Sequence, residues 1–561
     1  MSVFGRPSAS RAATRVIKTT TLRDFGGGLN VADTDLNMSP RFARVSENIE
    51  TTLDGSRAVR GPARHLATVN VEANVVNHTY FNGFVISVMD NGSIWKIDGA
   101  GNSEQMLLYP GLTKAWPAGV TYVSFTVQNS DLIIQNGRDK PLIVAGAASN
   151  SLYMKVSYLV DLGTLSNINT PIGKFVVSHG QYTIVSGIPD RPSVLSISAR
   201  NTSGTFLNDP APNDAVEIDV GARVAQRSAE IIGLLSHRDK LLVMFQGGIL
   251  PMLLGVYSGS PEVHTPTDEG FITDYGGIAH RAMQSIGDEA FFADSTSVSV
   301  LRRTSLTNTV KPERASQLID PLLIASMNSL TPQQMQQYVF AITDQRNKRY
   351  MLFVPTISAG GVITETVVYS YTYIPAIKRL AWARFRGWNF TSACRTSMQN
   401  LIFGIGNKFY YYDFTSTDAL DYIGDDDIND GAGVPITFDW ELPWADFGDH
   451  WAYKQIVAVA LDTEGEGFFT LEAYVNNIRK DEDGNPSPAA TMDFRGGDTT
   501  LYGGSGYGVD PFGTGRATTD ERMFKYEVPF SIIKFRIKGT TRKSLKIATL
   551  SFAYQKGLIS V

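Results

Sequence analysis

The sequence predicts an all-β protein whose largest part is a β-propeller, and three observations support this prediction. Helical periodicity is almost absent, whereas short runs of Val, Ile, Phe, Tyr and Thr alternate with Gly, Asn and Asp turns. An apolar strand, a tight polar or glycine turn and a second strand recur along the chain. The recurrences lie 47 to 60 residues apart, an interval typical of propeller blades built from four-stranded sheets.

The recurring hairpins predict six or seven blades. A long β protein could also offer apolar hairpins at this interval without forming a propeller, but here the strand–turn–strand pattern repeats together with the spacing. Two short helices are also expected, over residues 39–50 with Ser39 as N-cap and over residues 331–342 with Thr331 as N-cap. The hairpins begin at Phe84, Asp131, Gln181, Lys240, Glu289, Arg349 and Asn400.

The composition and the pattern of apolar residues change along the chain, and these changes predict three parts. Residues 1–67 read as an N-terminal arm and entry segment, and residues 68–420 as the propeller. Residues 421–561 alternate strictly between apolar and polar positions, which predicts a C-terminal β-sandwich-like domain. The acidic stretch "TSTDALDYIGDDDINDGAG" is expected to link the last two parts. The Gly-rich stretch "FRGGDTTLYGGSGYGVDPFGTG" is expected to be a long loop inserted in the sandwich.

Composition narrows the class of partner. The chain of 561 residues has a net charge of -5, which argues against a strongly basic surface for nucleic acid or anionic membranes. Charged residues make up 19%, below the roughly 25% of ordinary soluble domains, which hints at surface buried between subunits. The one cysteine, Cys394, excludes an intrachain disulfide and is expected to be a small buried side chain. With no apolar run of signal or membrane-spanning length, we expect a chain made in the cytoplasm.

The sequence offers little support for catalysis or metal binding. We therefore expect that the protein is not an enzyme and that it has no catalytic, cofactor-binding or metal-binding residues. The seven histidines lack the HExxH spacing, and no GxSxG elbow is present. The stretch Asp425–Gly431 resembles calcium-loop material but fails the EF-hand spacing, which favours a solvated acidic loop. Asp90, Gly92 and Trp95 match the later part of the Asp-box turn of sialidase-like propellers, which is a structural turn.

We interpret the stretch "DFGGGLN" at residues 24–30 as a structural turn of the backbone. No Gly-Lys-Ser/Thr follows it, so it is not a phosphate-binding loop. Gly26–Gly28 permit positive φ and close backbone approach, so the chain can turn tightly as it enters the first blade. Phe25 and Leu29 are expected to insert into apolar surface on either side of the turn.

The first 20 residues carry basic side chains without acidic ones. Such a segment buries too little apolar surface to fold alone, and we expect an assembly strap that docks on an acidic neighbour, with a solvated tail as the alternative. Deletion of residues 2–20 is then expected to leave the thermal unfolding of the isolated protein nearly unchanged. The basic residues before the first acidic residue, Asp24, are Arg6, Arg11, Arg15, Lys18 and Arg23.

Several stretches resemble virion proteins of short-tailed phages. "TTTLRDFGGGLNVADTDLNMSPRFARVSENIETTLDGSRAVRGPARH" is similar to the opening of the tail nozzle, or tail tubular protein B, family. "GIPDRPSVLSISARNTSGTF", "YGGIAHRAMQSIGDEAFFADSTSVSVLRR" and "RYMLFVP...VVYSYTYIPAIKRLAWARFRGW" resemble its successive propeller strands, and "FKYEVPFSIIKFRIKGTTRKSLKIATLSFAYQKG" its closing β domain. The stretch "RGPARH" departs from the commoner Arg-Pro-Gly form.

The resemblance implies a structural virion protein at the distal end of the tail. Such a protein forms a homo-oligomeric ring, typically a hexamer, that closes and then transmits the DNA channel during DNA ejection. Its implied partners are the tail adaptor protein above it, tail fibres, the passing genomic DNA and the host cell envelope. We expect a neutral to acidic lumen because of the net charge and of Asp425–Asp427. The alternatives are a receptor-binding or fibre-attachment module whose sandwich binds surface glycans, and a glycan-cleaving propeller enzyme.

Overall fold

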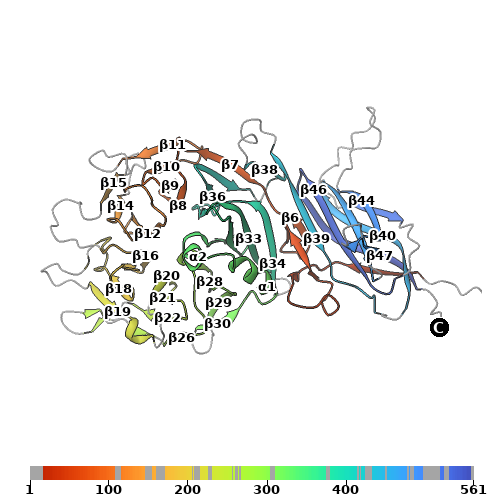
Figure 1. Ribbon diagram of the computed structural model, residues 1–561, viewed down its shortest axis with the longest axis horizontal. Helices are drawn as coiled ribbons and strands as arrows, with labels where there is room; N and C mark the ends of the chain where they lie inside the picture. Colours follow the sequence, from red (N-terminus) through yellow and green to blue (C-terminus); the bar gives the residue numbers. More distant parts are fainter. Residues whose placement is uncertain are drawn as a thin grey trace, which may run out of the picture.

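The computed structural model describes most of the chain. The described residues are 17–107, 115–145, 155–158, 171–204, 206, 215–224, 230–254, 257–258, 263–264, 267–268, 270–303, 310–374, 379–413, 416, 418–423, 433–448, 452–465, 467–476, 479–480, 486–496, 518–523 and 530–556. They form a propeller and a β-sandwich that lie side by side, with the N-terminal segment between them (Figure 1).

The described residues form a propeller of seven blades, each an antiparallel sheet of at least four strands, where the sequence predicted six or seven blades. Blades 1 to 3 comprise β8 (Val75–Phe81), β9 (Phe84–Met89), β10 (Ile94–Ile97) and β11 (Ser103–Met106); β12 (Ser124–Gln128), β13 (Asp131–Gln135), β14 (Leu142–Ala145) and β15 (Lys155–Tyr158); and β16 (Phe175–His179), β17 (Tyr182–Ser186), β18 (Val194–Ile197) and β19 (Val216–Asp219). Blade 4 comprises β20 (Ile231–His237), β21 (Lys240–Phe245) and β22 (Gly248–Leu253), with β25 (Thr267–Asp268) and β26 (Ile272–Thr273) at its edge.

Blades 5 to 7 complete the ring. They comprise β27 (Gln284–Ile286), β28 (Glu289–Ala293), β29 (Val298–Arg303) and β30 (Val310–Arg314); β31 (Phe340–Asp344), β32 (Arg349–Ile357), β33 (Ile363–Ile374) and β34 (Arg379–Trp388); and β35 (Ser392–Arg395), β36 (Leu401–Ile405), β37 (Lys408–Tyr412) and β7 (Ala63–Thr68). The first strands contact one another from each blade to the next between blades 2 and 7, and blade 7 contacts blade 1 in the same way. Each predicted hairpin falls on the second and third strands of one blade, except that the stretch at Arg349 covers only the second strand.

The N-terminal strand β7 closes the ring. It pairs antiparallel with β37, so that the outermost strand of blade 7 comes from the part of the chain that precedes blade 1. This arrangement ties the two ends of the propeller together with backbone hydrogen bonds. The expected boundary between residues 67 and 68 therefore falls within a propeller strand rather than between two parts.

The sandwich combines the C-terminal strands with four strands from the N-terminal segment. One sheet contains β45 (Thr518–Met523), β40 (Lys454–Gly465), β47 (Leu545–Lys556), β6 (Arg57–Val59) and β5 (Ile49–Thr51), with β1 (Ile17–Leu22) also paired to β47. The other contains β4 (Val45–Glu47), β39 (Val434–Glu441), β46 (Ile533–Thr541), β41 (Gly467–Val475) and β44 (Ala490–Gly496), with β38 (Leu420–Asp421) beside β39. Small pairs are formed by β2 (Gly28–Leu29) with β3 (Phe42–Ala43), β23 (Tyr257–Ser258) with β24 (Val263–His264), and β42 (Arg479–Lys480) with β43 (Pro486–Ser487).

The N-terminal segment is therefore not a separate arm from residue 17 onward. β1 pairs with β47 from Ile17 to Leu22, so the backbone of these residues is held by the sandwich of the same chain. Deletion of residues 2–20 would remove most of this strand, which the sequence could not show because the partner strand lies at the other end of the chain. Arg6, Arg11 and Arg15 lie outside the described residues, and the strap prediction is now restricted to residues 1–16.

One of the two expected helices is confirmed. α2 (Pro332–Tyr338) begins after Thr331, whose hydroxyl accepts from the Gln334 backbone amide while the Gln334 side chain accepts from the Thr331 amide. α1 (Asp320–Met327) precedes it and was not predicted. The helix expected over residues 39–50 is wrong, because this stretch instead forms β3, β4 and β5. These three strands pair with different partners, β3 with β2, β4 with β34 and β39, and β5 with β6, and this sheet pairing outweighs a weak local helical preference.

Candidate functional site

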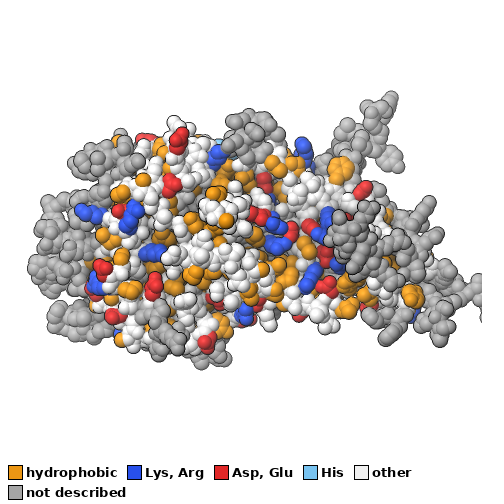
Figure 2. All heavy atoms as spheres, in the orientation of Figure 1, with side chains coloured by type: hydrophobic (Ala, Val, Ile, Leu, Met, Phe, Trp, Pro, Cys, Tyr) orange, Lys and Arg blue, Asp and Glu red, His pale blue; other side chains and the backbone are white. Residues whose placement is uncertain are grey.

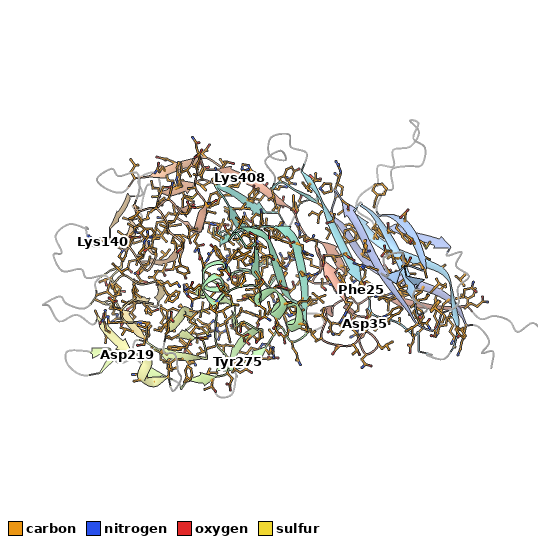
Figure 3. The ribbon with its side chains drawn as sticks, in the orientation of Figure 1. Phe25, Asp35, Lys140, Asp219, Tyr275 and Lys408 are labelled. Atoms are coloured by element: carbon orange, nitrogen blue, oxygen red, sulfur yellow. The ribbon has the colours of Figure 1, made fainter. Side chains whose placement is uncertain are left out.

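The triple glycine lies at the junction between the propeller and the sandwich. Phe25 is buried in the sandwich core, where its ring meets Trp440 edge-on with centroids 4.7 Å apart (Figure 3 labels Phe25). Leu29 is buried in the propeller core between blades 5 and 6. The two side chains do insert on either side of the turn, but the chain crosses here from the sandwich to blade 6 rather than entering the first blade.

Gly28 makes the crossing possible. Its φ is +75°, and a β-carbon at this position would lie 2.5 Å from the Trp382 backbone nitrogen in β34. The hydrogen atom of glycine lets the two backbones approach at a distance that no other residue permits. Blade 6 and the sandwich also share one continuous sheet, because β34 pairs with β4 through Arg384 and Glu47, and β4 pairs with β39.

Buried ion pairs reinforce the junction. Arg349 Nη1 in blade 6 lies 2.8 Å from Glu50 Oε2 in β5, and both side chains are 8% exposed. Arg60 donates to both carboxylate oxygens of Asp421, at 3.0 and 2.5 Å, and its guanidinium stacks 4.3 Å from the centroid of the Trp388 ring. Burial raises the pKa of Glu50 even with Arg349 alongside. These partners come from distant parts of the sequence, so no local motif indicates them.

A groove of about 860 Å³ runs along the outer face of the junction, across β34, β4, β39, β46, β41 and β44. Phe468 is 61% exposed there, an unusual exposure for a large aromatic side chain. Polar groups beside it are paired across the strands: Thr470 Oγ1 donates to Asp493 at 2.9 Å, and Lys538 Nζ lies 3.1 Å from Glu472. On the face seen in Figure 2, basic and acidic side chains lie side by side where the two units meet.

A second pocket, of about 480 Å³, lies at the end of the propeller where the inner strands of blades 1, 2, 6 and 7 begin, and turns of blades 1, 6 and 7 also line it. Arg281, in the 3₁₀ turn His280–Ala282 between blades 4 and 5, reaches across the axis and lines this pocket. Burial lowers the pKa of Arg281 to about 10. Its Nη1 donates to the carbonyls of Val76 (3.5 Å) and Gln337 (3.3 Å), and its Nη2 to Asn77 Oδ1 (3.3 Å) and the Thr391 carbonyl (3.0 Å).

The scattered histidines find a structural explanation in the propeller. Three of them form hydrogen bonds between the inner strands of neighbouring blades, which links the blades around the axis. The pairs are His78 Nδ1 with Ser392 Oγ (2.8 Å), His179 Nδ1 with Ser236 Oγ (2.9 Å) and His237 Nδ1 with Ser285 Oγ (2.8 Å).

The buried histidines predict that stability falls in acid. Burial lowers the pKa of His78 to about 3 and that of His280 to about 4, so the unfolded chain binds protons first as the pH falls below about 6.5. Stability is therefore full above pH 7 and decreases by about 2 kcal/mol per histidine between pH 7.5 and pH 5. Urea unfolding at a series of pH values should show this slope, and His78→Gln should make it shallower. Identical slopes for the two proteins would contradict the assignment.

The remaining sequence motifs that the structure describes form turns or buried parts of the propeller. Asp90–Gly92 form the turn between β9 and β10, and Trp95 is buried with its Nε1 donating to Ser93 Oγ at 3.0 Å. Cys394 is buried, as predicted, and burial raises the pKa of its thiol. Asp425–Asp427 lie outside the described residues. Within the described ranges, no group of three His, Cys, Asp or Glu side chains is arranged to hold a metal ion, and no helix is long and apolar enough to cross a membrane.

The likeness of the chain to known proteins is limited to its fold. No protein-family model and no curated protein matches the chain. Among solved structures it is similar to a streptogramin B lyase, at 9% identity and a TM-score of 0.39 over 63% of this chain and 97% of that chain. It is also similar to the WD40 propeller domain of Doa1 (9%, TM-score 0.34, 63% and 97%) and to YCF48 bound to a D1 peptide (9%, TM-score 0.34, 62% and 95%). These likenesses concern the propeller fold alone.

Proposed function

We propose that the protein is a structural subunit of the tail of a short-tailed phage and forms the distal nozzle ring that closes and then transmits the DNA channel. The proposal starts from the resemblance of the chain to the tail nozzle family. It assigns the protein to the virion, with six copies in the ring, the tail adaptor above it and no enzymatic activity.

The observation that best supports the proposal is the construction of the junction. A ring subunit under load from packaged DNA has to hold its parts in a fixed geometry, and two units joined by a flexible linker would hinge under that load. Here a shared sheet, a buried crossing strand and buried ion pairs join the propeller to the sandwich. Arg281 also spans the axis of the propeller itself. In the proposed assembly, DNA therefore passes through the lumen between subunits rather than through a propeller.

Assembly state tests the proposal. We expect a closed ring of about 370 kDa for six copies of the 61.4 kDa chain, measured by native mass spectrometry and seen end-on by negative-stain electron microscopy. Because assembly can require the adaptor, the experiment is repeated with tails purified from the phage. A chain that stays monomeric alone and is missing from the distal end of tails would overturn the proposal.

The second candidate is a receptor-binding module, and the groove at the junction favours it. An exposed aromatic ring beside paired polar groups, as at Phe468, offers an apolar platform and hydrogen-bonding partners of the kind that a surface glycan can use. This candidate predicts a monomer or a trimer in the same measurement. It also predicts loss of binding to host cells with Phe468→Ala, which a ring subunit without receptor contact would not show.

A further inference from the structure

We propose that an apolar pocket at the edge of the sandwich receives the N-terminal segment of a second copy of the chain, with Phe4 as the anchor. This segment, residues 1–16, precedes β1 and lies outside the described residues. Such docking gives the assembly strap a defined site. It can operate in a ring or in another oligomer of this chain, so it does not require the protein to be a tail nozzle.

The pocket, of about 330 Å³, opens between the two sheets of the sandwich beside β1. Aromatic rings line it: Phe535 stacks on Phe552 with centroids 4.4 Å apart, and Phe447 lies 5.8 Å from Phe552. Leu36 also lines the pocket and is 59% exposed. Because an apolar cavity of about 150 Å³ can hold a benzene ring, this pocket has room for the side chain of a phenylalanine.

The strand beside the pocket has an unpaired edge. β1 pairs with β47 along one side, and in the part of the chain that the structure describes no strand pairs with its other side. Exposed edges usually carry charges, proline or a bulge that prevent further pairing. β1 has one charged residue, Lys18, no proline and a regular register, and Ile17 is 58% exposed. Since Thr20 and Leu22 of β1 line the pocket, a strand that paired with this edge would direct alternate side chains towards it.

The N-terminal segment has the composition that such a site requires. Its sequence is "MSVFGRPSASRAATRV", in which Phe4 is the one aromatic residue, and burial of this ring would remove apolar surface from water. Arg6 follows two positions later. Asp446 is the charged residue among those that line the pocket, and its carboxylate, which accepts from the Gly448 amide at 2.9 Å, has the capacity to accept a further donor. The acidic residue at the pocket therefore complements the basic segment.

The sequence between the anchor and β1 directs the segment to a second copy. A tight hairpin that returned the segment to its own β1 would need residues that favour positive φ, usually Gly, Asn or Asp. None of these occurs from Ser8 to Leu22, so we expect the segment to leave its own strand. The twelve residues 5–16 span at most about 40 Å when extended, which is enough to reach the same pocket of an adjacent sandwich.

Disulfide crosslinking of full-length chains tests the proposal. A chain with Phe4→Cys is mixed with a chain with Leu36→Cys and treated with oxidised glutathione, while the native Cys394 is buried and does not react. We expect a crosslinked pair of chains whose disulfide joins positions 4 and 36, identified by peptide mass spectrometry. Met398→Cys is the matched control for Leu36→Cys, because Met398 is 72% exposed between β35 and β36 of the propeller.

Self-association measured by analytical ultracentrifugation gives a second readout. Phe4→Ala should weaken it at least tenfold, whereas Ser2→Ala should leave it unchanged. The docking site is overturned if no crosslinked pair forms, if Met398→Cys crosslinks as well as Leu36→Cys, or if a chain with both Phe4→Cys and Leu36→Cys forms the disulfide only within itself. A ring that assembles normally with Phe4→Ala would also remove the docking site, but it would leave the nozzle proposal in place.

Discussion

Gly28→Ala is expected to destabilise the protein by about 4 kcal/mol or more and to reduce the yield of folded protein sharply. The added β-carbon would lie 2.5 Å from the Trp382 nitrogen and 2.7 Å from the Ala381 α-carbon, so it meets backbone atoms of β34 that have no free space to move into. The positive φ of Gly28, +75°, adds the strain of a left-handed conformation. Thermal unfolding and limited proteolysis at the junction measure the effect.

Gly83→Ala is the matched control for this substitution. Gly83 has a φ of +90° in the turn between β8 and β9, and a β-carbon there would have no atom within 4 Å. Only the backbone strain remains, so we expect a cost of about 1 kcal/mol. Equal losses for the two variants would mean that close packing against β34 is not what requires glycine at position 28.

Glu50→Gln is expected to destabilise the protein by about 3 kcal/mol or more. The substitution leaves the guanidinium of Arg349, which is 8% exposed, without its closest counter-charge. Arg349→Met should cost less, because Glu50 can take up a proton and become neutral, whereas an arginine remains charged. Burial already raises the pKa of Glu50, which makes this escape easier. Urea unfolding at pH 7 measures both variants.

Glu313→Gln provides the control for the ion pair. Glu313 is 56% exposed, its partner Arg302 keeps a second carboxylate in Glu289, and exposed pairs are worth less than about 1 kcal/mol. If Glu50→Gln costs no more than this control, then the buried pair contributes nothing to the junction and the rigid connection has to rest on the shared sheet alone.

Local patterns were sufficient for the elements whose partners are near in sequence. The hairpin at Phe84 pairs residues that a short turn brings together, and alternation over a few residues is enough to indicate such a pair. The same holds for α2, where Thr331 and Gln334 satisfy each other within one turn. The helix predicted over residues 39–50 was wrong because the local interactions of a short segment are too weak to decide between a helix and three strands.

The class of fold, the repeat of the blades and a tight glycine turn after Phe25 followed from the amino-acid sequence, because each can be recognised within one hairpin or one turn. Three features became visible only in the folded chain: the N-terminal strands belong to the sandwich, Gly28 packs against β34, and Arg281 spans the propeller axis. Glu50 and Arg349 are about 300 residues apart in the chain, and they meet because the two units fold against each other. Such pairs gain their energy from burial and from the absence of competing water, and both arise only once the chain has folded.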